Sequence, residues 1–190
     1  MTNIRSRSTQ LVSVLVLMFG TGVLSMGGAD AALALTLTSS AFKPGAPIPS
    51  LYTCEGKDIS PPLSWEGVPA GAKSLALVLD DPDAPDPKAP KRVWVHWILY
   101  NLPPNANELA ENADGRGLPA GTVRGLTDSK KAKYGGPCPP IGRHRYVHKI
   151  YALDTTIDLA QATKAELEAA MKGHVLAQAE LIGTYQKGDR

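Results

Sequence analysis

The pattern of hydrophobic and polar residues predicts a chain built mainly of β-strands. Residues 75–79 are continuously apolar, which is typical of a short strand covered on both faces. Residues 93–100 carry apolar side chains at odd and even positions alike, so this strand should be central in its sheet. Simple alternation places His96 on the same face as Ile98, and Val95 on the opposite face.

Weaker strand signals surround this central pair. Leucine alternates with alanine and threonine over residues 33–38, which predicts an opening strand with one buried face. A short strand is expected at 52–55, and the prolines within 59–65 favour extended structure there. Residues 146–154 predict a further strand, in which His148 is interpreted as a structural core residue.

The second half of the chain is less regular. Residues 105–143 show no sustained period and are rich in glycine, so this segment is expected to be functional or to contain short strands. Thr163 and Glu166 have capping-box spacing and predict a helix, and a second helix is expected over 174–185. Strands followed by helices favour a β-rich sandwich with short C-terminal helices packed on it.

The N-terminus has the pattern of a targeting segment. Two arginines precede an apolar stretch at 11–19, and an A-x-A-like sequence follows at 29–31. We therefore expect residues 1–31 to be a cleaved signal peptide and residues 32–190 to form a single domain, periplasmic or secreted. The alternative is an uncleaved membrane anchor, although the apolar run is shorter than the ~20 residues that a spanning helix needs.

Composition and cysteine content narrow the possible functions. The chain has 190 residues and a formal net charge of +2, without a long basic block, so nucleic-acid binding is not supported. Cys54 and Cys138 are the two cysteines, and an even pair in an exported chain suggests a disulfide. Two free, buried thiols are the alternative, and no CxxC redox motif is present.

An acidic, proline-rich turn between the two central strands carries the first candidate chemistry. Asp81 and Asp83 follow the first strand, and prolines at 82 and 85 stiffen the turn. Asp80 is interpreted as a cap of this turn. Because buried polar groups need partners, His96 and these aspartates together predict one wall of a polar pocket at the end of a sheet.

A glycine- and proline-rich loop carries the second group of candidate functional residues. Residues 134–143 lead directly into a strand that opens with His144 and Tyr146, whose side chains project the same way because they lie two residues apart. Glycine lets the backbone approach a ligand closely. The amides of Gly135 and Gly136 are therefore expected to contribute to an anion-binding cradle.

These motifs together resemble those of a known family. Residues 81–85, 94–97 and 136–146 are similar, in the right order, to the phosphatidylethanolamine-binding protein (PEBP) family. Residues 54–65 resemble its bacterial and archaeal branch, the YbhB/YbcL type, often labelled Raf kinase inhibitor-like. The resemblance extends over about residues 34–186.

The resemblance implies a mainly β fold, an antiparallel β-sandwich with Greek-key character. It also implies a pocket for phosphate-like groups, phosphoethanolamine or acetate, and a cis proline bond in the acidic turn would be unsurprising. One departure is Thr-Asp-Ser at 127–129, where relatives often carry an asparagine and an aromatic residue. The residues that match pocket positions of the family are Asp81, Asp83, Trp94, His96, Gly136, His144 and Tyr146.

The chemistry of these residues agrees with such a pocket. His96, His144 and Tyr146 can donate hydrogen bonds to an anion. The two aspartates of the turn would orient the histidines or accept a hydrogen bond from an ammonium group. Trp94 would supply an apolar wall or a cation–π face.

The expected function is therefore that of a non-catalytic module that binds a small anion or a phospho-headgroup, without a cofactor or a bound metal. A protein-interaction role, such as that of a protease or kinase inhibitor, is the alternative. A metal-dependent enzyme using both histidines and both aspartates has less support, because HExxH and G-x-S-x-G are absent. The sequence identifies neither the ligand nor a protein partner.

Overall fold

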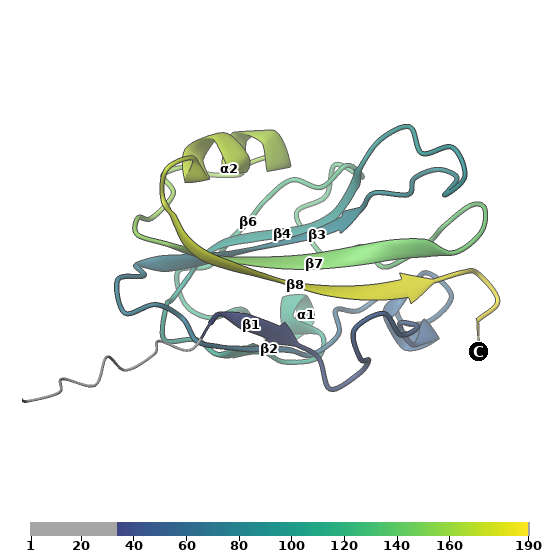
Figure 1. The fold of residues 1–190 in the computed structure, drawn as a ribbon, viewed down its shortest axis with the longest axis horizontal. Coiled ribbons are helices and arrows are strands. Elements are labelled where there is room, and N and C mark those ends of the chain that lie inside the picture. Colours follow the sequence, from purple (N-terminus) through teal and green to yellow (C-terminus); the bar gives the residue numbers. More distant parts are fainter. Residues whose placement is uncertain (1–33, 190) are drawn as a thin grey trace, which may run out of the picture. The chain divides into compact units, whose positions relative to one another are not determined.

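Two antiparallel sheets face one another in the computed structural model, which describes residues 34–189 (Figure 1). The smaller sheet has the order β1-β2-β5, and the larger has the order β6-β4-β3-β7-β8. This arrangement confirms the mainly β, antiparallel sandwich. The strands are β1 (Thr36–Thr38), β2 (Leu63–Glu66), β3 (Ser74–Asp81), β4 (Trp94–Leu102), β5 (Glu108–Leu109), β6 (Val123–Arg124), β7 (His144–Leu153) and β8 (Val175–Tyr185).

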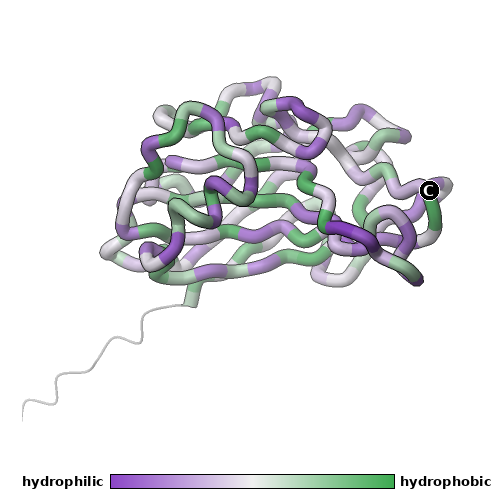
Figure 2. Tube along the Cα trace, turned by 90° about the horizontal axis from the view of Figure 1, so that it is seen from above, coloured by the Kyte–Doolittle hydropathy of each residue, from purple (hydrophilic) through white to green (hydrophobic). Residues whose placement is uncertain are grey.

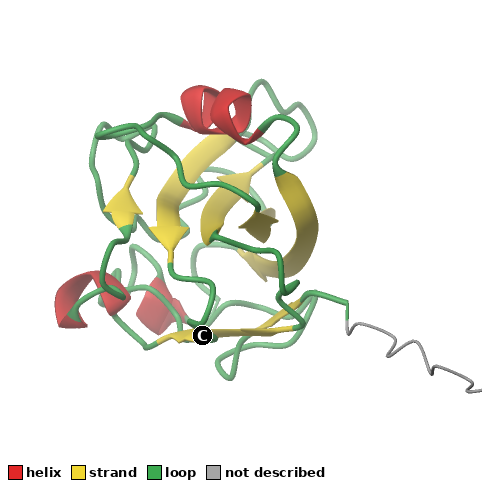
Figure 3. Ribbon diagram, turned by 90° about the vertical axis from the view of Figure 1, so that its left-hand side faces the viewer, coloured by secondary structure: helices red, strands yellow, loops and turns green. Residues whose placement is uncertain are grey.

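The larger sheet separates two hydrophobic cores, because both faces of its central strand β3 are apolar. Leu77 and Leu79 point into the core between the two sheets, where they join Trp65 of β2. The intervening residues of β3 pack on the other face with Leu167 and Met171 of helix α2 (Lys164–Met171). Figure 3 shows α2 on one side of the large sheet and the smaller sheet on the other. Figure 2 shows the same fold coloured by hydropathy, with hydrophobic stretches of chain interspersed with hydrophilic ones.

A β-bulge in β4 changes the orientation of His96. Leu79 pairs with Trp97, whereas the next residue of β3, Asp80, pairs with Val95, so one step along β3 corresponds to two steps along β4. The extra residue is His96. Val95 therefore belongs to the outer core with α2. The predicted division of the two faces is confirmed for residues 97–100, and it was wrong at Val95 because the bulge precedes Trp97.

The predicted second C-terminal helix was also wrong, since residues 174–185 form β8. This strand pairs with β7 along its whole length. Ala177, Ala179, Leu181 and Tyr185 alternate toward the inner core, with more exposed residues between them. Helix-favouring residues such as alanine, glutamine and glutamate adopt a strand here because pairing and burial override intrinsic propensity.

The helix predicted from the capping box of Thr163 and Glu166 is confirmed as α2. The Glu166 amide donates to Thr163 Oγ1 at 3.4 Å, and the Thr163 amide donates to the Glu166 carboxylate at 2.9 Å. The segment 105–143 does contain short strands, together with a helical turn, α1 (Ala113–Arg116). The short strand expected at 52–55 is absent there, because the 3₁₀ turn η1 occupies Ser50–Tyr52.

Asp80 lies within β3 and not at a turn, which corrects its interpretation as a cap. Its side chain is almost fully buried, and its Oδ2 accepts from Lys149 at 3.1 Å and from Lys164 at 2.7 Å. These contacts join β3, β7 and α2. A buried carboxylate needs such partners, because removing its charge from water is costly.

His148 is buried between the sheets, 5.7 Å from the ring of Phe42. Burial lowers its pKa to about 4, so the ring is neutral near pH 7. This placement agrees with the structural role expected for it.

The predicted signal peptide and its cleavage point lie outside the described residues. The part of the chain that is described forms one compact unit. None of its helices has the length and apolar character needed to cross a bilayer.

Candidate ligand-binding site

A cavity of about 510 Å³ opens where β3 ends and β4 begins. Ala84, Pro85 and Trp94 contribute an apolar wall, and Pro140 adds to it from the glycine-rich loop. The peptide bond between Ala84 and Pro85 is cis, as the resemblance implied. The ionisable residues that line the cavity are Asp58, Asp81, Arg92, His96, Lys131, Lys133 and Tyr134.

His96 presents one ring nitrogen to the protein. Its Nδ1 lies 2.8 Å from the carbonyl oxygen of Gly135, so this nitrogen donates and carries a proton. Burial lowers the pKa of His96, against the opposing effects of the Gly135 hydrogen bond and of nearby carboxylates, chiefly Asp81. The neutral ring therefore has its lone pair on Nε2, which forms no hydrogen bond within the described chain.

Asp81 connects the cavity wall to His144. Its Oδ2 lies 2.7 Å from His144 Nδ1, and its Oδ1 accepts from the Asp83 amide at 2.9 Å. His144 is fully buried, and its Nε2 lies 3.0 Å from the carbonyl oxygen of Ile141. Both nitrogens of His144 thus have protein partners, and this histidine lies behind the cavity without lining it.

Asp83 makes contacts with Arg145 instead of a ligand. Its carboxylate accepts from Arg145 Nε at 3.0 Å, from the terminal guanidinium nitrogen at 2.7 Å, and from the Arg145 amide at 2.8 Å. The hydrogen bond from Arg145 is the main cause that lowers the pKa of Asp83, and it outweighs burial. Asp83 does not line the cavity.

Tyr146 lies between the two histidines but below the cavity surface. Its ring centroid is 5.3 Å from that of His96, in an edge-on arrangement, and 6.5 Å from that of His144. The side chain is fully buried, which is the main cause that raises the pKa of its hydroxyl. Within the described chain this hydroxyl has no hydrogen-bond partner.

The glycine amides are occupied within the protein, which corrects the expected cradle. The Gly135 amide donates to the carbonyl oxygen of His96 at 3.1 Å, and the Gly136 amide donates to Asp58 Oδ1 at 2.6 Å. A Cβ at Gly136 would lie 2.4 Å from the carbonyl oxygen of Tyr52. Glycine is therefore required at 136 by tight packing against another loop.

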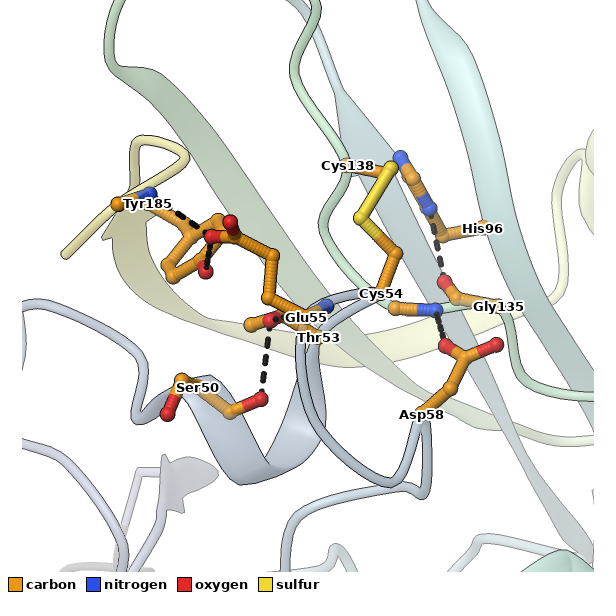
Figure 4. The surroundings of a disulfide bond; sticks show 11 residues. Ser50, Thr53, Cys54, Glu55, Asp58, His96, Gly135, Cys138 and Tyr185 are labelled. Carbon is orange, nitrogen blue, oxygen red and sulfur yellow. Dashed lines mark hydrogen bonds between the residues drawn. A yellow bond between two sulfur atoms is a disulfide. The ribbon is translucent and has the colours of Figure 1, made fainter. Parts of the chain in front are cut away.

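A disulfide forms part of the cavity wall (Figure 4). Cys54 and Cys138 are bonded, with their Cα atoms 5.4 Å apart, as predicted. The Cys54 amide also donates to the carbonyl oxygen of Pro137 at 3.1 Å. These contacts hold the loop of Asp58 against the glycine-rich loop, beside the His96 ring.

Of the seven predicted ligand-binding residues, the structure places four in the cavity lining: Asp81, Trp94, His96 and Gly136. Asp83, His144 and Tyr146 support the cavity from behind. The prediction omitted four ionisable residues of the lining: Asp58, Arg92, Lys131 and Lys133. Two of them were close to recognised motifs, since Lys133 directly precedes the glycine-rich loop and Asp58 lies within the motif at 54–65.

Arg92 and Trp94 both line the cavity and contact each other. The Arg92 guanidinium carbon lies 4.1 Å from the centroid of the Trp94 ring. Stacking on an aromatic face fixes the position of a cation without neutralising its charge. Ser129, another lining residue, comes from the 127–129 segment, in which the Asp128 carboxylate accepts from the Val95 amide at 3.1 Å.

The metal site considered above finds no support in the geometry. Among residues 34–189, no group of three or more histidine, cysteine, aspartate or glutamate side chains is arranged to hold a metal ion.

Comparisons with known proteins agree with this fold. Residues 38–186 match the family model for phosphatidylethanolamine-binding protein. A UPF0098 protein of Methanothermobacter thermautotrophicus is 52% identical over 156 residues, which are 81% of this chain and 100% of the relative.

Two solved structures are similar over the same part of the chain. A putative PEBP homologue from Chlamydia trachomatis has 47% identity and a TM-score of 0.74, covering 81% of this chain and 98% of that one. Escherichia coli YbcL, described as a member of the mammalian PEBP family, has 34% identity and a TM-score of 0.73, covering 81% and 99%. The chain therefore belongs to the phosphatidylethanolamine-binding protein family, within its bacterial and archaeal branch.

Proposed function

We propose that the cavity binds a small anionic group, such as a phosphate, a phospho-headgroup or a carboxylate, and that the protein is a binding module without catalytic activity. The observation that carries this proposal is the charge of the lining. Arg92, Lys131 and Lys133 line the cavity, whereas its two carboxylates already accept hydrogen bonds from the protein. The three cations also outnumber the two carboxylates, so the charge of the lining favours an anionic ligand.

His96 gives the cavity a group that adapts to the ligand. Its free Nε2 can accept from a protonated phosphate oxygen, or it can take up a proton and donate to a fully ionised anion. Pro85 and Trp94 give the cavity an apolar wall, and a charge-assisted hydrogen bond is stronger beside apolar groups than in open water.

A binding role, not a catalytic one, is supported by the hydroxyl and thiol groups nearby. The Ser129 hydroxyl lies 2.9 Å from that of Thr127, and both cysteines of the lining are bonded to each other. Neither group is therefore poised beside a histidine as a nucleophile.

We also propose that the protein acts in an oxidising compartment, in agreement with the predicted export. The disulfide is solvent-exposed at both cysteines and would be vulnerable to reduction in a thiol-rich cytosol.

Calorimetric titration at constant ionic strength tests the binding proposal. Phosphate and phosphoethanolamine should bind, and ethanolamine, which lacks the anion, should not. Lys131→Gln should weaken binding several-fold, because it removes one lining cation. Lys73→Gln is the matched control, since Lys73 is exposed at the opposite end of β3. Absence of binding by both anions at millimolar concentration would refute the proposal.

A further inference from the structure

A second hollow, of about 550 Å³, adjoins the first. The two share Asp58, Lys133 and Tyr134, so the same three residues form the ridge between them. Tyr134 is buried, and its hydroxyl donates to the carbonyl oxygen of Tyr52 at 2.8 Å. The ridge is therefore anchored to the core.

The carboxylates of the second hollow are already engaged. Asp114 pairs with Arg124, with 2.7 Å between Oδ1 and Nε, and its Oδ2 accepts from the Tyr134 amide at 2.7 Å. Asp58 accepts from the Gly136 amide. Lys57 and Lys133 also line this hollow, and neither forms an ion pair within the described chain.

Basic residues therefore continue from one hollow into the next. Arg92 and Lys131 line only the first, Lys57 and Arg124 line only the second, and Lys133 lines both. Counted together, five basic and three acidic residues line the pair. A single compact anion in the first hollow leaves Lys57, in the second, without an ionic partner within the described chain, whereas Arg124 is already paired with Asp114.

We propose that the second hollow is a subsite for a second anionic group of the same ligand. The preferred ligand is then an elongated molecule with two separated anionic groups, such as a phosphomonoester that carries a further phosphate or carboxylate. This inference rests on the proposed function of the first cavity. When both anionic groups belong to one molecule, binding of the first group holds the second close to its subsite. The affinity of the whole molecule then exceeds that of either group alone.

A chain-length series tests this directly. Alkane diphosphonates of increasing length are compared by calorimetry with monophosphonates of matched length, at constant pH and ionic strength. One chain length should bind at least about tenfold more tightly than its monophosphonate, with one ligand per chain. A twofold gain is expected merely because two equivalent ends can each enter the first cavity.

Variants assign the gain to the subsite. Lys57→Gln should remove most of the diphosphonate gain, because Lys57 lines only the second hollow. Lys131→Gln should weaken both kinds of ligand, and Lys73→Gln should weaken neither. Lys57, Lys73 and Lys131 are all exposed, so none of the three substitutions should destabilise the fold. Thermal unfolding curves check this for each variant.

The outcomes separate the two proposals. If monophosphonates bind and no diphosphonate exceeds the twofold gain, the subsite is refuted and the first cavity stands. A gain that persists in Lys57→Gln, or one ligand shared by two chains, also refutes the subsite. If neither class of ligand binds, both proposals fail.

Discussion

The Gly136 amide donates a hydrogen bond to the carboxylate of Asp58 over 2.6 Å, at the ridge between the two hollows. A glycine-rich loop of this kind is typical of sites where backbone amides hold an anion. Here an anionic side chain of the protein already takes that position. The charge of Asp58 therefore opposes an incoming anion, while its hydrogen bond keeps the loop in place.

Asp58→Asn should strengthen anion binding. The amide oxygen of asparagine can still accept from Gly136, while the negative charge at the cavity is lost. We expect phosphate affinity to rise about threefold to tenfold, and the free energy of unfolding to fall by about 1 kcal/mol because the hydrogen bond is no longer charge-assisted. Calorimetry and chemical denaturation measure the two effects.

Asp158→Asn provides the control for Asp58→Asn, because Asp158 is exposed and does not line either hollow. It changes the net charge equally and should leave phosphate affinity within about twofold. Unchanged or weaker binding by Asp58→Asn would contradict the role given to this carboxylate.

Anion binding should strengthen as the pH falls, through His96. Burial holds the pKa of His96 below 6.5 in the free protein, and a bound anion raises it by stabilising the imidazolium. Affinity for sulfate, whose charge is constant in this range, should therefore increase as the pH falls through the pKa of the bound state. It should level off once the free protein is also protonated.

His96→Gln should remove this pH dependence, because glutamine does not titrate. The measurement is sulfate affinity by calorimetry in buffers of different ionisation enthalpy, which also reports the proton uptake. A slope that survives in His96→Gln would assign the dependence to another group.

Asp83→Asn should affect stability and not ligand binding. Arg145 holds the pKa of Asp83 below its usual 3.8, so the pair stabilises the fold above that pH, and the contribution is lost as the pH falls through the lowered pKa. Because Arg145 is 58% exposed, solvent screens the pair, and we expect a loss of only about 1 kcal/mol near pH 7.

Denaturant titrations of wild type and Asp83→Asn across acidic pH check this. The two curves of unfolding free energy should converge below pH 3.8, and phosphate affinity should agree within about twofold. A large loss of phosphate affinity without a loss of stability would contradict this prediction and would indicate that Asp83 contributes to ligand binding.

Reduction of the disulfide should destabilise the protein. Cys54 and Cys138 are 84 residues apart, for which the chain-entropy model gives about 4.5 kcal/mol. Measured effects are often smaller, and we expect a loss of about 2–4 kcal/mol in the free energy of unfolding. Chemical denaturation with and without a reducing agent, with thiol titration, measures it.

The double variant Cys54→Ser, Cys138→Ser is the control for reduction. It should match the reduced protein and show no response to the reducing agent. Full reduction without a change in the denaturation midpoint would contradict the prediction, because it would mean that the disulfide does not contribute to the stability of the fold.

Much of this protein can be predicted from local patterns in its sequence. The apolar runs at 75–79 and 93–100 mark the central strands because both their faces are buried. The capping box of Thr163 and Glu166 is a local signal, since its hydrogen bonds join residues three apart. The motifs at 81–85, 94–97 and 136–146 are sufficient to identify the family, whose fold brings them to one cavity.

What only the tertiary structure decided depends on contacts between distant residues. The bulge at His96 is an extra residue in one strand relative to its partner, so it exists only in the pairing of β4 with β3. Residues 175–185 form a strand because β7 offers a paired edge that outweighs their helical propensity. Likewise, Asp58 accepts a hydrogen bond from the Gly136 amide, which is 78 residues away in the sequence. The packing of the two loops brings these residues together, and the local sequence around either one does not predict the contact.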